Sequence, residues 1–192
     1  MAEKPDYPTR RFATATAFET WLAKNHATAE GVWLQLAKKA SGKATVSYAE
    51  AVEVALCYGW IDGHVKPVDE ASWKQKFTPR RARSKWSAIN VGRAERLIAE
   101  GRMQPAGLAA IEAAKADGRW AAAYASPKSI TVPDDLRAAL GANLAAGTAF
   151  AALTGTNRYA ILYRVHDAKK PETRARRIAQ YVAMLARGET LR

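Results

Sequence analysis

Apolar and polar residues alternate with a period of two in three short segments, and this pattern predicts β-strands. In residues 32–36 every second side chain is a large aliphatic one, as in a half-buried strand. In residues 73–77 aromatic and amide side chains alternate with Lys74 and Lys76, which predicts one aromatic and one cationic face. Residues 60–65 form a third strand-like segment. Together these segments predict a small antiparallel sheet.

Most of the remaining chain has the 3.6-residue apolar period of helices. Thr16 with Glu19, and Ser47 with Glu50, have the spacing of capping boxes at helix starts. The predicted helices span residues 17–25, 48–58, 84 or 87 to 100, 105–117, 134–140, 144–153, 156–165 and 171–187. In the helix that ends at Glu100, Ile89, Leu97 and Ile98 are expected to be the main apolar side chains.

The order of these segments predicts a mostly helical α+β protein. An N-terminal α+β domain is expected over residues 1–125, with helices beside the small antiparallel sheet. The segment SPKSITVP, residues 126–133, is the best linker candidate because of its prolines and serines. An all-α module is expected over residues 134–192.

Composition narrows the class of protein. The chain has 192 residues, 48% of them hydrophobic, which is enough for a substantial core. It has no run of about 18 apolar residues, so no transmembrane segment is expected. The first residues lack the apolar stretch of a secretory signal, and Cys57 is the only cysteine. A cytoplasmic location is therefore expected.

The formal net charge is +12, and the excess is clustered. Residues 74–102 hold nine basic side chains against two acidic ones, and residues 158–187 hold eight against two. A basic excess can simply follow from an arginine-rich genome. Clustering instead favours a surface that attracts polyanions.

The densest cluster is the segment WKQKFTPRRARSKW, residues 73–86, which contains no acidic residue. A buried segment cannot hold so many uncompensated cations. A disordered tail is not expected to contain so many large aromatic residues. We therefore expect an ordered segment that presents its cations to an anion, with Phe77 or Trp86 available for stacking. The alternative is internal pairing with Glu50, Asp62, Asp69 or Glu70. The expected anion-binding residues here are Lys74, Lys76, Arg80, Arg81, Arg83 and Lys85.

A second basic cluster begins the last helix. Its expected anion-binding residues are Lys169, Lys170, Arg176 and Arg177, close to the free amides of a helix start. A solvated helix face is the alternative interpretation. Arg174 falls on the apolar stripe of this helix, so it is predicted to be partly buried and paired with an acid.

Candidate catalytic groups are few. If residues 60–65 are extended, Trp60, Asp62 and His64 project to one side and could form a small polar pocket. Asp62 followed by Gly63 is also a strong turn signal. Cys57 lies in an apolar helix and is expected to be structural. No metal-ligand spacing, phosphate-binding loop or dinucleotide fingerprint occurs, so neither a metal nor a cofactor is expected.

Several motifs resemble one protein family. The pieces SYAEAVEVALCYGWIDG, FTPRRARSKWSAIN, RLIAEGRMQPAGLAAIEAAKADGRW and NRYAILYRVHDAKKPETRARRI are similar to those of the YdeI/OmpD-associated family, also called bacteriocin-protection proteins. The family names imply association with an outer-membrane porin or tolerance of antimicrobial peptides. The resemblance brings no set of catalytic residues.

The favoured hypothesis is a non-enzymatic binding protein whose cationic, aromatic surface binds a polyanion such as nucleic acid. One alternative is a small-molecule enzyme or sensor, with a pocket around Trp60, Asp62, His64 and the basic segment 80–85. Another is an adaptor that binds a protein partner of the envelope or stress machinery. Binding is favoured over catalysis because no assembled acid, base or nucleophile can be identified.

Overall fold

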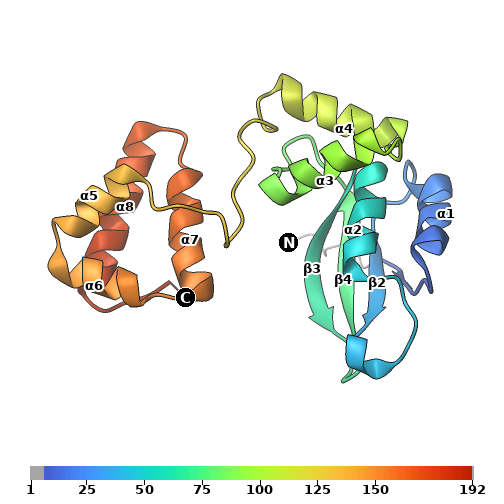
Figure 1. Cartoon of the computed structure of the whole chain (residues 1–192), viewed down its shortest axis with the longest axis horizontal. Helices are drawn as coiled ribbons and strands as arrows, with labels where there is room; N and C mark the ends of the chain where they lie inside the picture. The colour runs from blue at the N-terminus through green and yellow to red at the C-terminus, as the bar shows by residue number, and fades with distance from the viewer. Residues whose placement is uncertain (1–6, 192) are drawn as a thin grey trace, which may run out of the picture. The chain divides into compact units, whose positions relative to one another are not determined.

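The structure, a computed structural model, describes residues 7–191 and contains two compact units. The first unit comprises the described residues up to Trp86 together with Asn90–Ala122. The second comprises Ser87–Ile89 and the described chain from Ala123 onward. Figure 1 shows a sheet with its helices in the first unit and helices in the second. About half of the residues are helical, as expected for a mostly helical α+β protein.

The first unit holds the sheet. Its elements, apart from the first residues of α3, are β1 (Thr9–Arg10), α1 (Ala15–Asn25), β2 (Val32–Ala37), the short 3-10 helix η1 (Lys39–Ser41), α2 (Tyr48–Cys57), β3 (Trp60–Pro67), β4 (Ser72–Pro79), α3 (Ala88–Ala99) and α4 (Pro105–Ala116). The strand order is β1-β2-β4-β3. The antiparallel pairing of β2, β4 and β3 is confirmed.

The sheet is mixed rather than purely antiparallel, because β1 runs parallel to β2. The amide of Trp33 donates to the carbonyl of Pro8, 2.9 Å away, where the chain enters this pairing. A two-residue polar strand has no apolar alternation, so periodicity alone could not reveal it.

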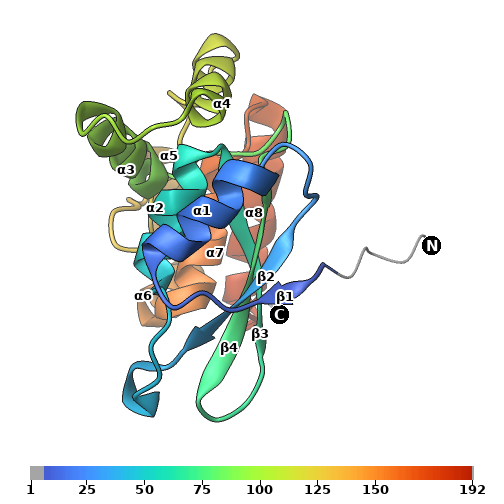
Figure 2. The ribbon, with the colours of Figure 1, turned by 90° about the vertical axis from the view of Figure 1, so that its right-hand side faces the viewer.

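Strand register separates two faces of the sheet. Val32 pairs with Phe77 and Leu34 with Gln75, and these side chains lie on the face toward α1 and α2. Phe18 of α1 contacts Phe77 there, with ring centroids 5.8 Å apart. Figure 2 shows α1 and α2 together on this side of the strands. The register confirms the expected aromatic and cationic faces of β4.

Local capping explains where α1 and α2 begin. Ser47 and Glu50 form the predicted capping box, with the Ser47 amide donating to the Glu50 carboxylate at 2.9 Å. The box predicted for α1 is wrong, because its N-cap is Thr14, whose hydroxyl accepts from the amide of Ala17 at 3.2 Å. Thr16 lies inside the helix.

The packed side of α3 also differs from the prediction. Ala94 and Leu97 are fully buried, whereas Ile89 is 49% and Ile98 39% exposed. Residues three or four apart share a helix face, so Ile98 lies at the edge of the stripe through Ala94 and Leu97, and Ile89 lies outside it. In α3, the position of an apolar residue along the helix predicted its burial better than the size of its side chain did.

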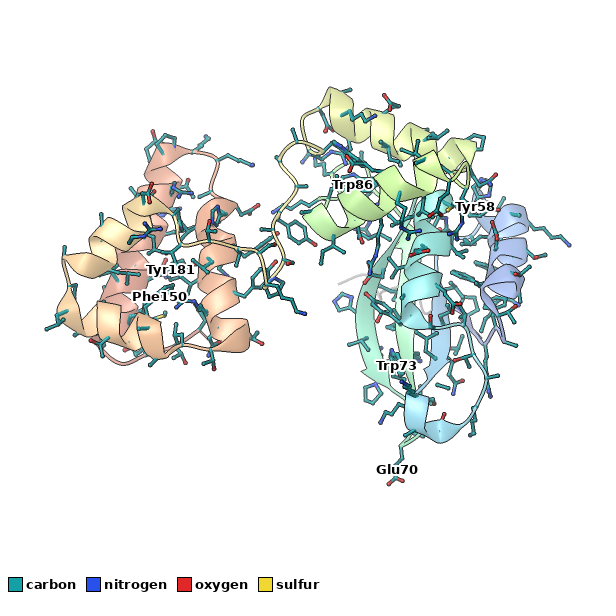
Figure 3. The ribbon with its side chains drawn as sticks, in the orientation of Figure 1. Tyr58, Glu70, Trp73, Trp86, Phe150 and Tyr181 are labelled. Carbon is teal, nitrogen blue, oxygen red and sulfur yellow. The ribbon has the colours of Figure 1, made fainter. Side chains whose placement is uncertain are left out.

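The second unit is helical and has its own core. Its principal helices are α5 (Asp134–Gly141), α6 (Leu144–Ala152), α7 (Gly155–His166) and α8 (Pro171–Ala186), close to the predicted bounds. The core contains Phe150 of α6 and Tyr181 of α8, both buried and labelled in Figure 3. Ile178 and Leu185 follow the predicted apolar stripe of α8.

Candidate anion-binding surface of the first unit

The sheet face opposite α1 and α2 carries a tryptophan under two lysines. Trp33 of β2 pairs with Lys76 of β4, and Lys74 pairs across the sheet with Lys66 of β3. The Nζ atoms of Lys66 and Lys74 each lie 5.1 Å from the centroid of the Trp33 ring. We call Trp33, Lys66, Lys74 and Lys76 the cationic face.

Among residues 7–191, no carboxylate lies within ion-pair distance of these ammonium groups. Within the described residues, Lys66, Lys74 and Lys76 form no ion pair. A cation–π contact at an exposed site is worth only about 0.5–1 kcal/mol. Two ammonium ions over one ring also repel each other, so an anion placed between them would be stabilised.

A hairpin with a bulge places Lys66 opposite Lys74. Asp69 in the connecting turn accepts from the amide of Ala71 and the hydroxyl of Ser72, each at 2.8 Å. The Ser72 hydrogen bond lowers the pKa of Asp69. The register shifts between Asp62 and Val65, where the Gly63 carbonyl accepts from the Gln75 side chain at 2.7 Å.

The loop after β4 is ordered by its own aromatic and hydroxyl groups. The guanidinium of Arg80 lies 3.6 Å from the Trp86 ring centroid and donates to the carbonyl of Lys85 at 3.2 Å. The amide of Arg81 donates to Ser84 Oγ at 2.9 Å. Arg119 donates to the carbonyl of Ser84 at 2.8 Å. We call residues 80–85 the basic loop.

Arg81 and Arg83 are the exposed arginines of the basic loop. Both are exposed, and neither forms an ion pair within residues 7–191. Three of the proposed internal partners are engaged elsewhere. Glu50 bonds to Ser47, Asp62 accepts from Tyr48, and Asp69 accepts from Ser72. For Arg81 and Arg83, the structure therefore shows no internal pairing with these acids.

Phe77 and Trp86 are core residues, which corrects the expectation that they could stack on a ligand. Phe77 is fully buried beneath α1. Trp86, labelled in Figure 3, is 2% exposed. The guanidinium of Arg80 lies over its ring, and the ring centroid of Trp120 is 4.8 Å from its own. Their rings anchor β4 and the basic loop, since neither presents a face to solvent.

The bulge in β3 breaks the alternation on which the pocket of Trp60, Asp62 and His64 depended. Trp60 is buried, and its indole N–H donates to the carbonyl of His26 at 3.2 Å. Asp62 accepts from the Tyr48 hydroxyl at 2.7 Å. His64 is exposed and lies within the register shift, so the strand pattern no longer assigns it to the side of Trp60 and Asp62.

Cys57 is a structural residue, as predicted. Its side chain is buried, and burial raises the pKa of the thiol to about 11. A protonated thiol is a poor nucleophile at neutral pH. Within the part of the chain that the structure describes, no three side chains of metal-ligand type come together.

In the second unit, part of the basic cluster on α8 serves the fold. Arg174 forms a two-point ion pair with Asp135, with distances of 2.5 and 2.9 Å, which confirms its predicted burial and pairing. Arg177 donates to the carbonyl of Arg164. The exposed cations of this cluster are Lys169, Lys170 and Arg176.

Trp33 and Lys66 belong to the site but were not predicted from the sequence. Strand alternation does place Trp33 opposite Val32 and Leu34, so a large aromatic on the solvent side of β2 was a usable signal. Lys66 follows the bulge, and its neighbour across the sheet depends on a register that periodicity cannot supply.

These observations define a basic protein with an α+β unit, whose open sheet face is cationic, and a helical unit. A family model described as "Domain of unknown function (DUF8412)" matches residues 10–110, more than half of the chain, so the chain belongs to that family. A second, described as "Bacteriocin-protection, YdeI or OmpD-Associated", matches residues 129–188 and supports the family resemblance. No curated protein and no solved structure matches the chain. Among the described helices, none is long and apolar enough to cross a bilayer.

Proposed function

We propose that the first unit binds the phosphate backbone of nucleic acid through the cationic face and the exposed arginines of the basic loop. The observation that carries this proposal is the pair Lys66 and Lys74, held over Trp33 without a carboxylate partner in the described part of the chain. The protein is then a binding protein rather than an enzyme. A cytoplasmic location, where nucleic acid is present, is part of the proposal.

The distribution of acids in the first unit supports this assignment. Arg96 pairs with Glu53 and Glu100, and Arg102 pairs with the same two carboxylates. Glu53 and Glu100 therefore neutralise Arg96 and Arg102. Lys66, Lys74, Lys76 and Arg81 have no such ion pair in the described chain, so the cationic face and the basic loop carry part of the charge excess.

The chemistry of these groups suits phosphate contact. Lysine ammonium groups act as point charges toward phosphate, and arginine adds a planar fork of donors. Phosphate contacts carry little sequence information, so binding should depend weakly on base sequence. It should also weaken steeply with salt, because neutralised phosphates release counterions.

The test is binding of a labelled mixed-sequence oligonucleotide at low salt, followed by fluorescence anisotropy. The double variants are Lys66→Ala with Lys74→Ala, and Arg81→Ala with Arg83→Ala. Each should raise Kd about tenfold or more, because one cation near a polyanion contributes about 1 kcal/mol. Circular dichroism checks that each variant is folded.

The matched control removes the same charge elsewhere. Lys24→Ala with Lys128→Ala changes two exposed lysines, one on α1 at the covered side of the sheet and one in the second unit. We expect this control to change Kd less than threefold or so, by long-range charge alone. Equal losses in all three double variants, or no complex with the wild type, would contradict the proposal. Capture of a specific protein that resists nuclease treatment would favour the adaptor alternative.

A further inference from the structure

Trp33 differs from Trp60, another tryptophan of the sheet, by what lies over its ring. Trp60 packs against Trp21 of α1, with ring centroids 5.9 Å apart on the covered face. Trp33 lies on the opposite face and yet is only 5% exposed. The cations that lie over its ring are those of Lys66 and Lys74. The side chains of Lys66 and Lys74 therefore form part of what covers this aromatic ring.

The two lysines are a movable cover. Each ammonium group is at the end of a four-carbon chain, and neither forms an ion pair in the described structure. A charge-assisted hydrogen bond to phosphate is stronger than an exposed cation–π contact. A phosphate backbone that passes over the sheet would draw both ammonium groups from the ring.

The strand that carries the Trp33 ring is held in place by its neighbours in the sheet. Trp33 is in the interior of the sheet, between Thr9 of β1 and Lys76 of β4. Its backbone amide donates a hydrogen bond to the carbonyl of Pro8, so the indole is attached to a paired strand rather than to a loop. Such a position suits a preorganised contact.

From this geometry we infer that Trp33 stacks on an unpaired base once Lys66 and Lys74 have moved to the phosphates, so that the surface prefers single-stranded nucleic acid to duplex. The inference rests on the proposed function, because the phosphates must reach the lysines first. Bases of a duplex are already stacked and paired, so a duplex contacts only the cations. Single-strand binding adds the stacking contact, which is worth about tenfold in affinity.

The first test uses the wild-type sequence labelled with 5-fluorotryptophan and observed by fluorine NMR. The chain has six tryptophans, and Trp33→Phe identifies the resonance of Trp33. A thymidine oligomer is compared with an abasic oligomer of the same length and charge. We expect the Trp33 resonance to shift with both, because the lysines move, and to shift further with thymidine.

The second test measures affinity. Trp33→Leu should weaken binding of the thymidine oligomer about tenfold more than binding of the abasic oligomer or of a duplex. Trp33→Tyr, which retains an aromatic ring, should restore most of the lost affinity. The variant Lys66→Ala with Lys74→Ala should weaken all three ligands.

The outcomes separate the two proposals. Equal binding of thymidine and abasic oligomers, with identical Trp33 shifts, overturns the stacking inference and leaves phosphate binding intact. An equal loss for all ligands in Trp33→Leu, unrelieved in Trp33→Tyr, also overturns stacking. If the wild type binds none of the ligands, both proposals fail.

Discussion

The arginines of this protein differ in whether a carboxylate lies within reach of the guanidinium group. Arg174 donates to both oxygens of Asp135 and to the carbonyl of Val165, so three of its donor contacts are internal. Arg81 and Arg83 are exposed and have no acid partner in the described chain. The residue type is the same, and the difference lies in the neighbours that the fold supplies.

The Asp135–Arg174 pair predicts a pH-dependent stability. Hydrogen bonding from Arg174 holds the pKa of Asp135 below its ordinary value of 3.8. A carboxyl with a lowered folded-state pKa stabilises the protein above its unfolded-state pKa, and this contribution is lost as pH falls through the folded-state value. We expect Asp135→Asn to lower the free energy of unfolding by roughly 1 kcal/mol at neutral pH, a small value because the pair is partly in water. Urea titrations at neutral pH and below about pH 3 measure the difference.

Asp134→Asn is the matched control for this experiment. Asp134 is the adjacent carboxylate, is almost fully exposed, and its ion pair with Arg137 is longer, at 3.4 Å. Its replacement should change stability by less than about 0.5 kcal/mol at either pH. A loss in Asp135→Asn that is equally large in acid would refute the role of the ion pair.

At the scale of elements, helix starts and the β3–β4 hairpin place the site. The capped start of α2 fixes the helix that covers the sheet, and Gly59 then has a φ of +71° before β3 begins. A side chain at Gly59 would approach the carbonyl of Ala106 to 2.9 Å, so both conformation and packing favour glycine there. The hairpin then brings Lys66 beside Lys74.

The two threonines near the start of α1 allow a direct test of capping. Thr14→Ala should lower the free energy of unfolding by about 1 kcal/mol, because the hydroxyl that accepts from Ala17 is lost. Thr16→Ala is the matched control and should be neutral or slightly stabilising, since alanine has the higher helix propensity. Thermal or urea unfolding measures both variants. A larger loss in Thr16→Ala would mean that α1 begins at the later residue.

Much of the element order was predictable because periodicity and capping are local. The strand containing Val32 and Leu34, the capping box at Ser47 and the helices of the second unit follow from such patterns. The parallel pairing of β1 and the register shift after Asp62 do not, because both depend on partners distant in sequence. Because of this shift, the predicted pocket of Trp60, Asp62 and His64 does not follow from strand alternation.

At the scale of the whole molecule, charge is uneven. The net charge is +12, yet Arg96 and Arg102 are neutralised by shared acids. The excess therefore lies on other surfaces, which include the cationic face. The sequence predicted a cationic surface that includes Lys74 and Lys76, but not Lys66, nor that Trp86 would be buried and Trp33 would lie beneath lysines. Those facts follow from three-dimensional packing.

The most direct test of the central claim is the salt dependence of single-strand binding. For single strands, log Kd rises with log salt by about 0.7 for each phosphate neutralised. If Lys66, Lys74, Arg81 and Arg83 contact phosphates, replacing all four with alanine should lower this slope by up to about 3, with the fold intact by circular dichroism. An unchanged slope in the fourfold variant would show that these side chains do not contact phosphate, and would contradict the account.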